Sequence, residues 1–126
     1  MMKLVAVGLG GLIGALGRYG LSGLVHRWLG GSFPYGTLAV NAAGCLLIGA
    51  LMYLVEERSL LTPNLRLFLG IGVLGAFTTF STFGYETVEL LRDRQIWYAF
   101  MNVAGNVVLG IAAVIAGYAG VRAAGF

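Results

Sequence analysis

Charged residues are scarce in this sequence: of its 126 residues, 10% are charged and 59% are hydrophobic. Soluble globular proteins carry about 25% charged residues. So few polar side chains cannot cover the surface of a soluble fold, and the composition therefore predicts an integral membrane protein. Because membrane-spanning segments account for nearly all of the sequence, we expect one transmembrane domain over residues 1–126.

Cysteine is almost absent as well. Cys45 is the single cysteine, which excludes an intrachain disulfide and a cluster of thiolate metal ligands. It lies in an apolar run and is interpreted as a small packing residue. Clusters of basic residues are also missing, because the lysines and arginines are scattered near the ends of the apolar segments. They are typical of anchors for lipid headgroups and argue against binding of nucleic acid.

Four apolar segments have the length of about 20 residues that a transmembrane helix needs. They cover approximately residues 4–24, 36–55, 65–91 and 96–121, and they predict an all-α membrane protein. The first segment lacks the cleavage site of a secretory signal, so we interpret it as a retained helix. No carboxylate lies in the middle of the first, second or fourth segment. This absence argues against a proton-coupled exporter.

Basic residues divide almost evenly between the two sides of the predicted bundle. One side would carry Lys3, Arg58, Arg66 and Arg122, and the other Arg27, Arg92 and Arg94. An excess of lysine and arginine on one side normally sets the orientation of a membrane protein. Two hypotheses stay open: a feature other than charge fixes one orientation, or the chain inserts both ways and forms an antiparallel pair.

Glycine is abundant, with 21 residues, many of them inside the apolar segments. Small residues allow transmembrane helices to approach one another closely, so we expect dense helix packing. A four-helix protomer of this size has little interior of its own for a polar path. We therefore expect a homo-oligomer.

The third segment contains hydroxyl residues that hydrocarbon cannot satisfy. Residues 75–86 read Gly-Ala-Phe-Thr-Thr-Phe-Ser-Thr-Phe-Gly-Tyr-Glu. Helical spacing separates the phenyl rings from Thr78, Ser81 and Thr82; the usual interpretation is an aromatic core with hydroxyls bonded to their own helix. Hydroxyl and β-branched residues directly after Gly75 nevertheless favour a helix break. Carbonyl oxygens at a break suit a cation such as Na⁺, whereas hydroxyls, amide N–H groups and phenyl edges suit a small anion.

Asparagines and an arginine are the other polar residues predicted at membrane depth. Asn41 either bonds to a neighbouring helix or lines a path for a ligand. Asn102 and Asn106 are four residues apart, so they share one helix face and indicate a polar lining. We expect Arg18 either to reach the membrane interface or to face an aqueous vestibule, where it would attract anions.

Three stretches resemble the CrcB or Fluc family of fluoride channels. They are Gly-Ala-Leu-Gly-Arg-Tyr at 14–19, Gly-Thr-Leu-Ala-Val-Asn-Ala-Ala-Gly at 36–44, and residues 72–86 with the core Thr-Thr-Phe-Ser-Thr-Phe. The resemblance implies an antiparallel, dual-topology homodimer of four-helix protomers. Each protomer would have its third helix broken near the middle, and the dimer would hold two fluoride pores and a central structural Na⁺.

The resemblance also implies roles for individual residues. Backbone carbonyls of Gly75 and Thr78 would bind the Na⁺. The implied pore residues are Asn41, Thr79, Phe80, Ser81, Thr82 and Phe83, with the phenyl rings meeting fluoride through their edges. Asn102 and Asn106 join this lining mainly because of their spacing. Glu86 would lie towards one vestibule and Arg18 near the other.

The implied function is a passive, fluoride-selective channel, and not an enzyme. It would relieve fluoride toxicity in the cell. The channel would lie in a bacterial or archaeal plasma membrane, which is the inner membrane in a Gram-negative cell. Its partners would be fluoride, an inverted copy of the chain and the lipid bilayer. One alternative is a small multidrug-type exporter, which needs a carboxylate in its first span where this chain has Arg18. Another is a structural membrane subunit in which polar substitutions affect assembly alone.

Overall fold

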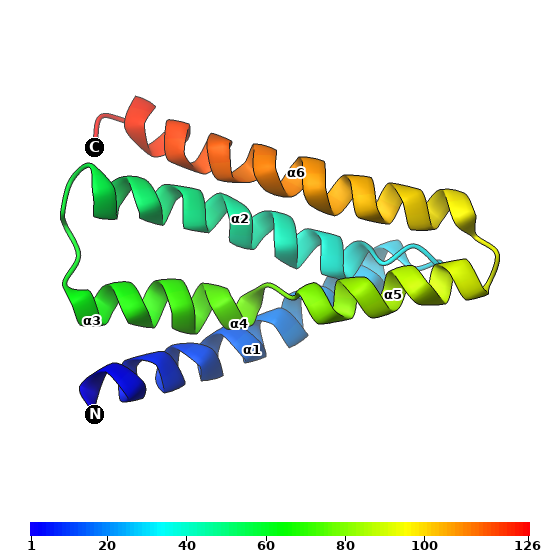
Figure 1. Ribbon diagram of the computed structural model, residues 1–126, viewed down its shortest axis with the longest axis horizontal. Helices are drawn as coiled ribbons and strands as arrows, with labels where there is room; N and C mark the ends of the chain where they lie inside the picture. The colour runs from blue at the N-terminus through cyan, green and yellow to red at the C-terminus, as the bar shows by residue number, and fades with distance from the viewer.

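Four long helical segments run back and forth along the molecule (Figure 1), and the computed structural model describes residues 1–126. The first, second and last segments are the continuous helices α1 (Met2–Leu29), α2 (Tyr35–Glu56) and α6 (Ile96–Ala123). The third segment is built from the successive helices α3 (Pro63–Arg66), η1 (Leu67–Leu74), α4 (Gly75–Phe77) and α5 (Phe80–Arg92). No strand is present.

Each segment is long and apolar enough to cross a membrane, with the third counted over Pro63–Arg92. The prediction of an all-helical protein with four apolar spans is therefore confirmed. The largest difference from the predicted boundaries is at the end of α1, which continues to Leu29 rather than to residue 24. Its last turn contains His26 and Arg27, whose polarity ended the apolar pattern in the sequence before the helix ends.

Turn residues separate the helices at the positions where their chemistry requires it. Gly30 and Gly31 have φ angles of 58° and 74°, a left-handed conformation that glycine adopts without strain. Thr62 begins the third segment, because its side chain accepts a hydrogen bond from the Leu65 N–H at 3.2 Å and Pro63 follows as the first helical residue. These signals place the loops at the ends of the bundle.

The third segment leaves helical geometry in its middle. Helix η1 has π-helical hydrogen bonding over eight residues and leads into the short α4. Thr78 and Thr79 are then extended, with φ and ψ of −86° and 158° and of −148° and 122°, before α5 begins. The sequence predicted a break directly after Gly75. The first extended residue is Thr78, three positions after Gly75.

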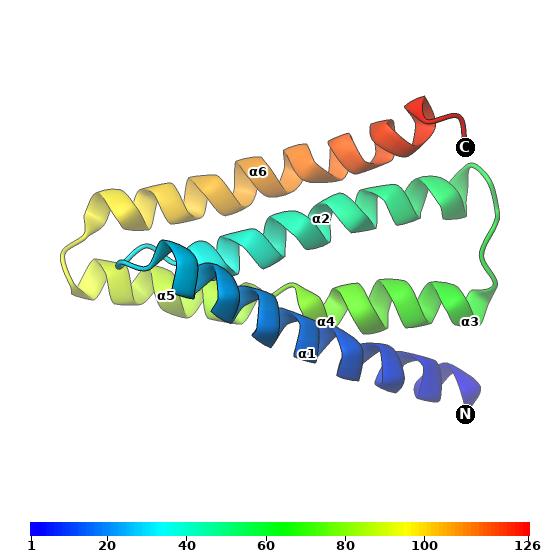
Figure 2. The ribbon, with the colours of Figure 1, turned by 180° about the vertical axis from the view of Figure 1, so that it is seen from behind.

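Glycines bring the helices into direct backbone contact. Helix α2 packs along α6, and α1 packs along η1 while crossing the third segment (Figure 2). A Cβ on Gly14 of α1 would overlap the carbonyl oxygen of Val73, and one on Gly49 of α2 would overlap that of Val114. This close approach is the packing that small residues permit in membrane helices.

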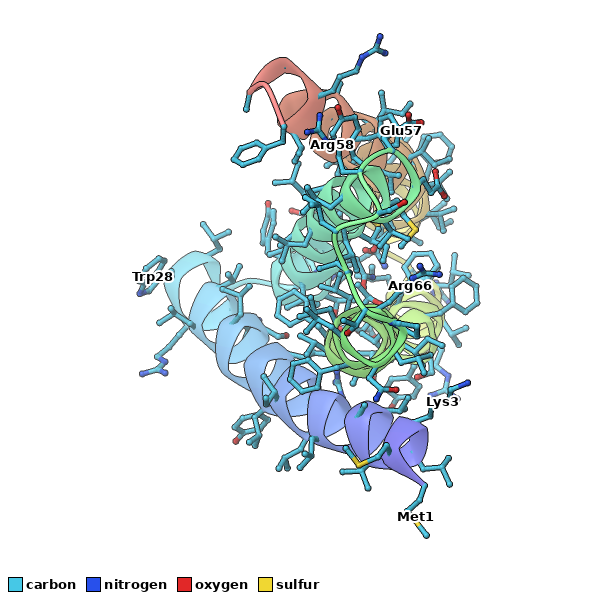
Figure 3. The ribbon with its side chains drawn as sticks, turned by 90° about the vertical axis from the view of Figure 1, so that its left-hand side faces the viewer. Met1, Lys3, Trp28, Glu57, Arg58 and Arg66 are labelled. Carbon is cyan, nitrogen blue, oxygen red and sulfur yellow. The ribbon has the colours of Figure 1, made fainter.

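Apart from Arg18, charged side chains lie towards the ends of the bundle. Lys3, Arg58 and Arg66 are spread across the end that also holds both termini and the α2–α3 loop (Figures 1 and 3). Helix α1 runs diagonally away from this end, and Trp28 stands apart from the other helices (Figure 3) with 75% of its surface exposed. Only 19 of the 126 residues are buried within the single chain. Most large apolar side chains are therefore free to contact lipid or another chain.

Candidate functional site

The polar side chains converge on the extended residues between α4 and α5. A helix leaves its last carbonyl oxygens and its first N–H groups without partners inside the helix. At the interruption these free groups lie in the middle of a candidate membrane span, Pro63–Arg92. Hydrocarbon offers them no hydrogen bond, so side chains from other helices must supply the partners.

Asn41 of α2 binds both backbone polar groups of Thr79. Its Oδ1 accepts a hydrogen bond from the Thr79 N–H at 2.8 Å, and its Nδ2 donates to the Thr79 carbonyl oxygen at 3.1 Å. The second Nδ2 hydrogen goes to Oδ1 of Asn106 on α6 at 2.8 Å. Both donors of the Asn41 amide are thus in use. Of the two alternatives for Asn41, the structure gives the bond to a neighbouring helix, and the side chain also borders a pocket.

Arg18 of α1 binds the other side of the interruption. Its Nε donates to the carbonyl oxygen of Ala76 at 3.1 Å, at the C-terminal end of α4. A cation at a helix C-terminus is favourable because the free carbonyls give that end a partial negative charge. The side chain is half-buried. The sequence predicted Arg18 at the membrane interface or in an aqueous vestibule. The structure brings the side chain to the middle of the third segment, and the vestibule stays a prediction.

Helix α5 begins with a group of hydroxyls. Thr79 caps the helix, because its Oγ1 accepts from the Thr82 N–H at 3.2 Å and donates to the Thr82 Oγ1 at 3.1 Å. The Ser81 Oγ lies 3.5 Å from the same Thr79 oxygen. The N-terminal end of a helix carries a partial positive charge and attracts anions. The hydroxyls therefore surround the electropositive end of α5.

Phe80 and Phe83 lie beside these hydroxyls on the first turn of α5. Their ring centroids are 5.5 Å apart and their planes are tilted by 56°. Phe83 is buried, whereas 82% of the Phe80 surface is exposed in the protomer. The Phe83 ring therefore belongs to the core of the chain, and the Phe80 ring faces outward.

An open pocket of about 380 Å³ lies next to the interruption. Of the residues predicted for the pore, five border it: Asn41, Thr79, Phe80, Phe83 and Asn106. Gly75 and Thr78, which were predicted to bind Na⁺, border it too. The rest of its wall is Gly44, Cys45, Ile48, Gly70, Leu74 and Val107. Ser81, Thr82 and Asn102 were predicted in the same lining but are not part of this wall. The pocket has no charged residue and offers amide and hydroxyl groups on an otherwise apolar surface.

The two asparagines of α6 have different depths although they share a face. Asn106 Nδ2 donates to the carbonyl oxygen and to Oδ1 of Asn102, at 2.9 and 3.0 Å. Asn102 is completely buried, and its Nδ2 donates to Thr87 Oγ1 at 2.9 Å. Thr87 in turn donates to the Phe83 carbonyl oxygen at 2.8 Å. Sequence reasoning missed Thr87; its place four residues after Phe83, where a hydroxyl reaches back to a helix carbonyl, was the available signal.

Glu86 lies in a second pocket of about 320 Å³, away from the asparagines. The other polar residues there are His26, Ser32, Glu89 and Asp93, at the end of the bundle where α5 and α1 finish. The Glu86 Oε1 is buried without a hydrogen-bond partner. Glu86 is therefore separated from the pocket that holds Asn41.

Comparisons with known proteins agree on one family. The family model described as "CrcB-like protein, Camphor Resistance (CrcB)" matches residues 5–118. A fluoride-specific ion channel FluC from Nitratidesulfovibrio vulgaris is 49% identical over 113 residues, which are 89% of this chain and 90% of that protein. FluC of Geobacter sp. (strain M21) is 50% identical over 86% of this chain and 87% of its own length. FluC of Geobacter sulfurreducens is 44% identical over 98% of each chain.

The Asn41 bonds predict that replacing the amide weakens the fold. Asn41→Asp removes the amide donors facing the Thr79 carbonyl and Asn106 Oδ1, so acceptors face acceptors. We expect a loss of about 1–3 kcal/mol, the cost of leaving buried polar groups unpaired. Thermal unfolding of the purified protein in detergent, followed by tryptophan fluorescence, would show a lower midpoint. Asn64→Asp on the exposed α3 is the matched control; equal midpoints for the two variants would contradict the role of Asn41.

Proposed function

The chain belongs to the CrcB family, and we infer from this membership that it is a fluoride channel of the bacterial plasma membrane. The observation that carries this conclusion is the 44–50% identity to fluoride-specific channels over 86–98% of the chain. Four apolar helices make it a multi-pass membrane protein. A channel needs no catalytic residues, and the protein is not an enzyme. The multidrug-exporter alternative is not favoured.

We propose that fluoride passes along the pocket beside the interruption. Fluoride holds its water strongly, so a pore must replace that hydration with donors that bind neither too weakly nor too tightly. The proposed contacts are Asn41, Thr79, Phe80, Ser81, Thr82, Phe83 and Asn106, whereas Asn102, also predicted for the lining, is completely buried behind the pocket. Hydroxyls at the positive end of α5 and the electropositive edges of phenyl rings offer attraction without a fixed charge. Arg18 and Glu86 would act on the ion from a greater distance.

Asn41 would take part by exchanging one partner for another. Both of its Nδ2 hydrogens are already bonded, to Thr79 O and to Asn106 Oδ1. A fluoride ion can therefore accept a hydrogen bond from Asn41 only where it displaces one of these oxygens. Such an exchange keeps constant the number of hydrogen bonds that Asn41 donates, which suits an ion that must enter and leave quickly.

Export would be passive and driven by the fluoride gradient. Hydrogen fluoride is a weak acid that crosses membranes uncharged, dissociates near neutral pH and leaves fluoride inside the cell. A selective pore lets the trapped ion flow out down its electrochemical gradient. No coupling ion or ATP is needed in this scheme.

Reconstituted protein tests the function and the role of Phe80. Liposomes loaded with fluoride and opened to K⁺ with an ionophore should release fluoride and retain chloride. Phe80→Ile keeps an apolar side chain but removes the ring edge, and we expect its fluoride efflux to fall about tenfold or more. Phe100→Ile, on an exposed phenylalanine of α6, should match the unsubstituted protein.

Two outcomes would contradict these proposals separately. Absence of fluoride release at several protein densities would exclude the channel. Unchanged efflux in Phe80→Ile, with the channel active, would remove only this ring from the pore.

We propose further that two inverted copies form the channel. Support comes from the outward-facing Phe80, which is 82% exposed beside an open pocket, and from the even division of basic residues between the ends. A second protomer would cover the exposed ring and complete the wall. Because lysine and arginine differ by only one residue between the two ends, neither orientation is favoured.

Labelling from one side of the membrane tests the dual topology. In a Cys45→Ala background, Ser59→Cys and Ser32→Cys place a thiol in exposed loops at opposite ends without changing the charge. An impermeant maleimide added to intact cells should label about half of each variant. Complete labelling of one variant and none of the other would show a single orientation and contradict the proposal.

We also propose a structural Na⁺ bound by backbone carbonyls of Gly75 and Thr78 from both copies. The Thr78 carbonyl oxygen accepts no hydrogen bond from the protein, and carbonyl oxygens are ligands that hard cations prefer. Gly75 is exposed on the protomer surface, where the second copy would lie. The cation would bind carbonyl oxygens that have no hydrogen-bond donor within one protomer.

Replacement of Na⁺ tests this site. A bound ion stabilises the folded dimer by RT ln(1 + [L]/Kd), about 2.7 kcal/mol at a concentration of 100 Kd. The unfolding midpoint should therefore rise with Na⁺ when N-methylglucamine is exchanged for it at constant ionic strength. Potassium serves as the control cation. The same midpoint in all three salts would contradict a selective Na⁺ site.

A further inference from the structure

Asn102 and Thr87 lie behind the fluoride pocket and do not border it. Asn102 of α6 is completely buried, and Thr87 of the neighbouring helix α5 is half-buried. We propose that they are positioning residues, which hold the Asn41 amide and the Phe83 backbone in their working orientation through one chain of hydrogen bonds. The proposal deepens the proposed fluoride channel and rests on it for the consequence for flux.

The chain of hydrogen bonds starts at a backbone donor whose direction is fixed. The Thr79 N–H can only donate, so the atom of Asn41 that faces it at 2.8 Å is the oxygen. The Asn41 nitrogen must then point towards Asn106, whose Oδ1 accepts at 2.8 Å. The orientation of one backbone amide thus determines the orientation of two side chains.

The same orientation of Asn106 is required from the other end. Its nitrogen lies 2.9 Å from the carbonyl oxygen of Asn102, and a backbone carbonyl can only accept. The Asn102 Oδ1 accepts from this nitrogen as well, at 3.0 Å. The Asn102 Nδ2 therefore points away, to Thr87 Oγ1 at 2.9 Å.

Thr87 is the last side chain in this series of hydrogen bonds, and it lies on α5. Its Oγ1 accepts from Asn102 and donates to the Phe83 carbonyl oxygen at 2.8 Å. Every bond from Thr79 to Phe83 therefore runs in one sense, and a flip of any amide would bring donor against donor or acceptor against acceptor. The series of hydrogen bonds begins at Thr79, just before the first turn of α5, and ends at Phe83, one turn later. Phe80 and Phe83 therefore lie in the part of α5 between its two ends.

This arrangement predicts an effect at a distance from the site of substitution. Thr87→Val has nearly the same shape but lacks both the acceptor for Asn102 and the donor for Phe83. The Asn102 amide is then free to turn, so Asn106 Nδ2 loses the Oδ1 acceptor and keeps only the Asn102 carbonyl oxygen. Asn106 is held less firmly as a result, and so is the Asn41 amide that donates to it. Thr87→Ser keeps the hydroxyl and should restore the chain.

Selective ¹⁵N labelling of asparagine tests this effect without fluoride. The sequence contains only four asparagines, and the fourth, Asn64, lies on the exposed α3 outside the chain. Thr87→Val should shift the side-chain amide signals of Asn41, Asn102 and Asn106 in detergent-solubilised protein and leave Asn64 unchanged. Thr87→Ser should give the wild-type spectrum.

Efflux from liposomes is measured on the same variants, per folded dimer. We expect Thr87→Val to lower fluoride efflux by about tenfold, the size expected for losing one or two hydrogen bonds, and Thr87→Ser to stay within about twofold. A lower unfolding midpoint with unchanged Asn41 signals and unchanged efflux would overturn the proposal, because Thr87 would then be a structural contact only.

Wild-type protein gives a further test that needs no substitution. The side-chain amide hydrogens of Asn41, Asn102 and Asn106 should exchange with D₂O much more slowly than those of Asn64. Exchange at the Asn64 rate would overturn the proposal even where Thr87→Val does not fold. Failure of the wild-type protein to release fluoride would instead reject the proposed function and leave the spectra to decide on the hydrogen-bond chain.

Discussion

The extended backbone at Thr78 and Thr79 is the constraint on which the rest of the structure depends. Each unpaired backbone group costs several kcal/mol in hydrocarbon, so an interrupted membrane helix is stable only where other chain segments supply its partners. Helix α1 supplies Arg18 to Ala76, and α2 supplies Asn41 to Thr79. The polar residues of separate helices therefore converge on one point because the backbone requires them there.

The groups that satisfy the interruption are also the ones that would meet fluoride. Asn41 holds Thr79 and borders the pocket, and Thr79 caps α5 and borders the same pocket. In the proposed channel, stability and conduction would consequently be coupled in these residues. Loss of efflux on substituting either one is informative only when the folded fraction is known, whereas Phe80, with its exposed ring, makes no such hydrogen bond.

Helix positions were predictable because bilayer thickness fixes the length of an apolar segment. The hydroxyl-rich stretch was recognisable because few other residues carry donors into the membrane, but of its hydroxyl residues only Thr78 and Thr79 border the pocket, and Ser81 and Thr82 do not. Depth was not predictable: Asn102 and Asn106 share a face, yet only Asn106 borders the pocket, because Thr87 of α5 receives the Asn102 amide. The place of Arg18 was not predictable either. Its partner is 58 residues away in the sequence, and local polarity alone favours the interface.

The near-balance of basic residues at the two ends has an evolutionary consequence. If the chain inserts in both directions, each loop is exposed to the cytoplasm in half of the molecules and to the outside in the other half. Selection then acts on the difference between the two ends and not on any single loop charge. A lysine gained near Arg58 would be tolerated when another is gained near Arg94. In such a lineage, a charge change in a loop at one end would be accompanied by a matching change in a loop at the other end, although the two positions never touch within one protomer.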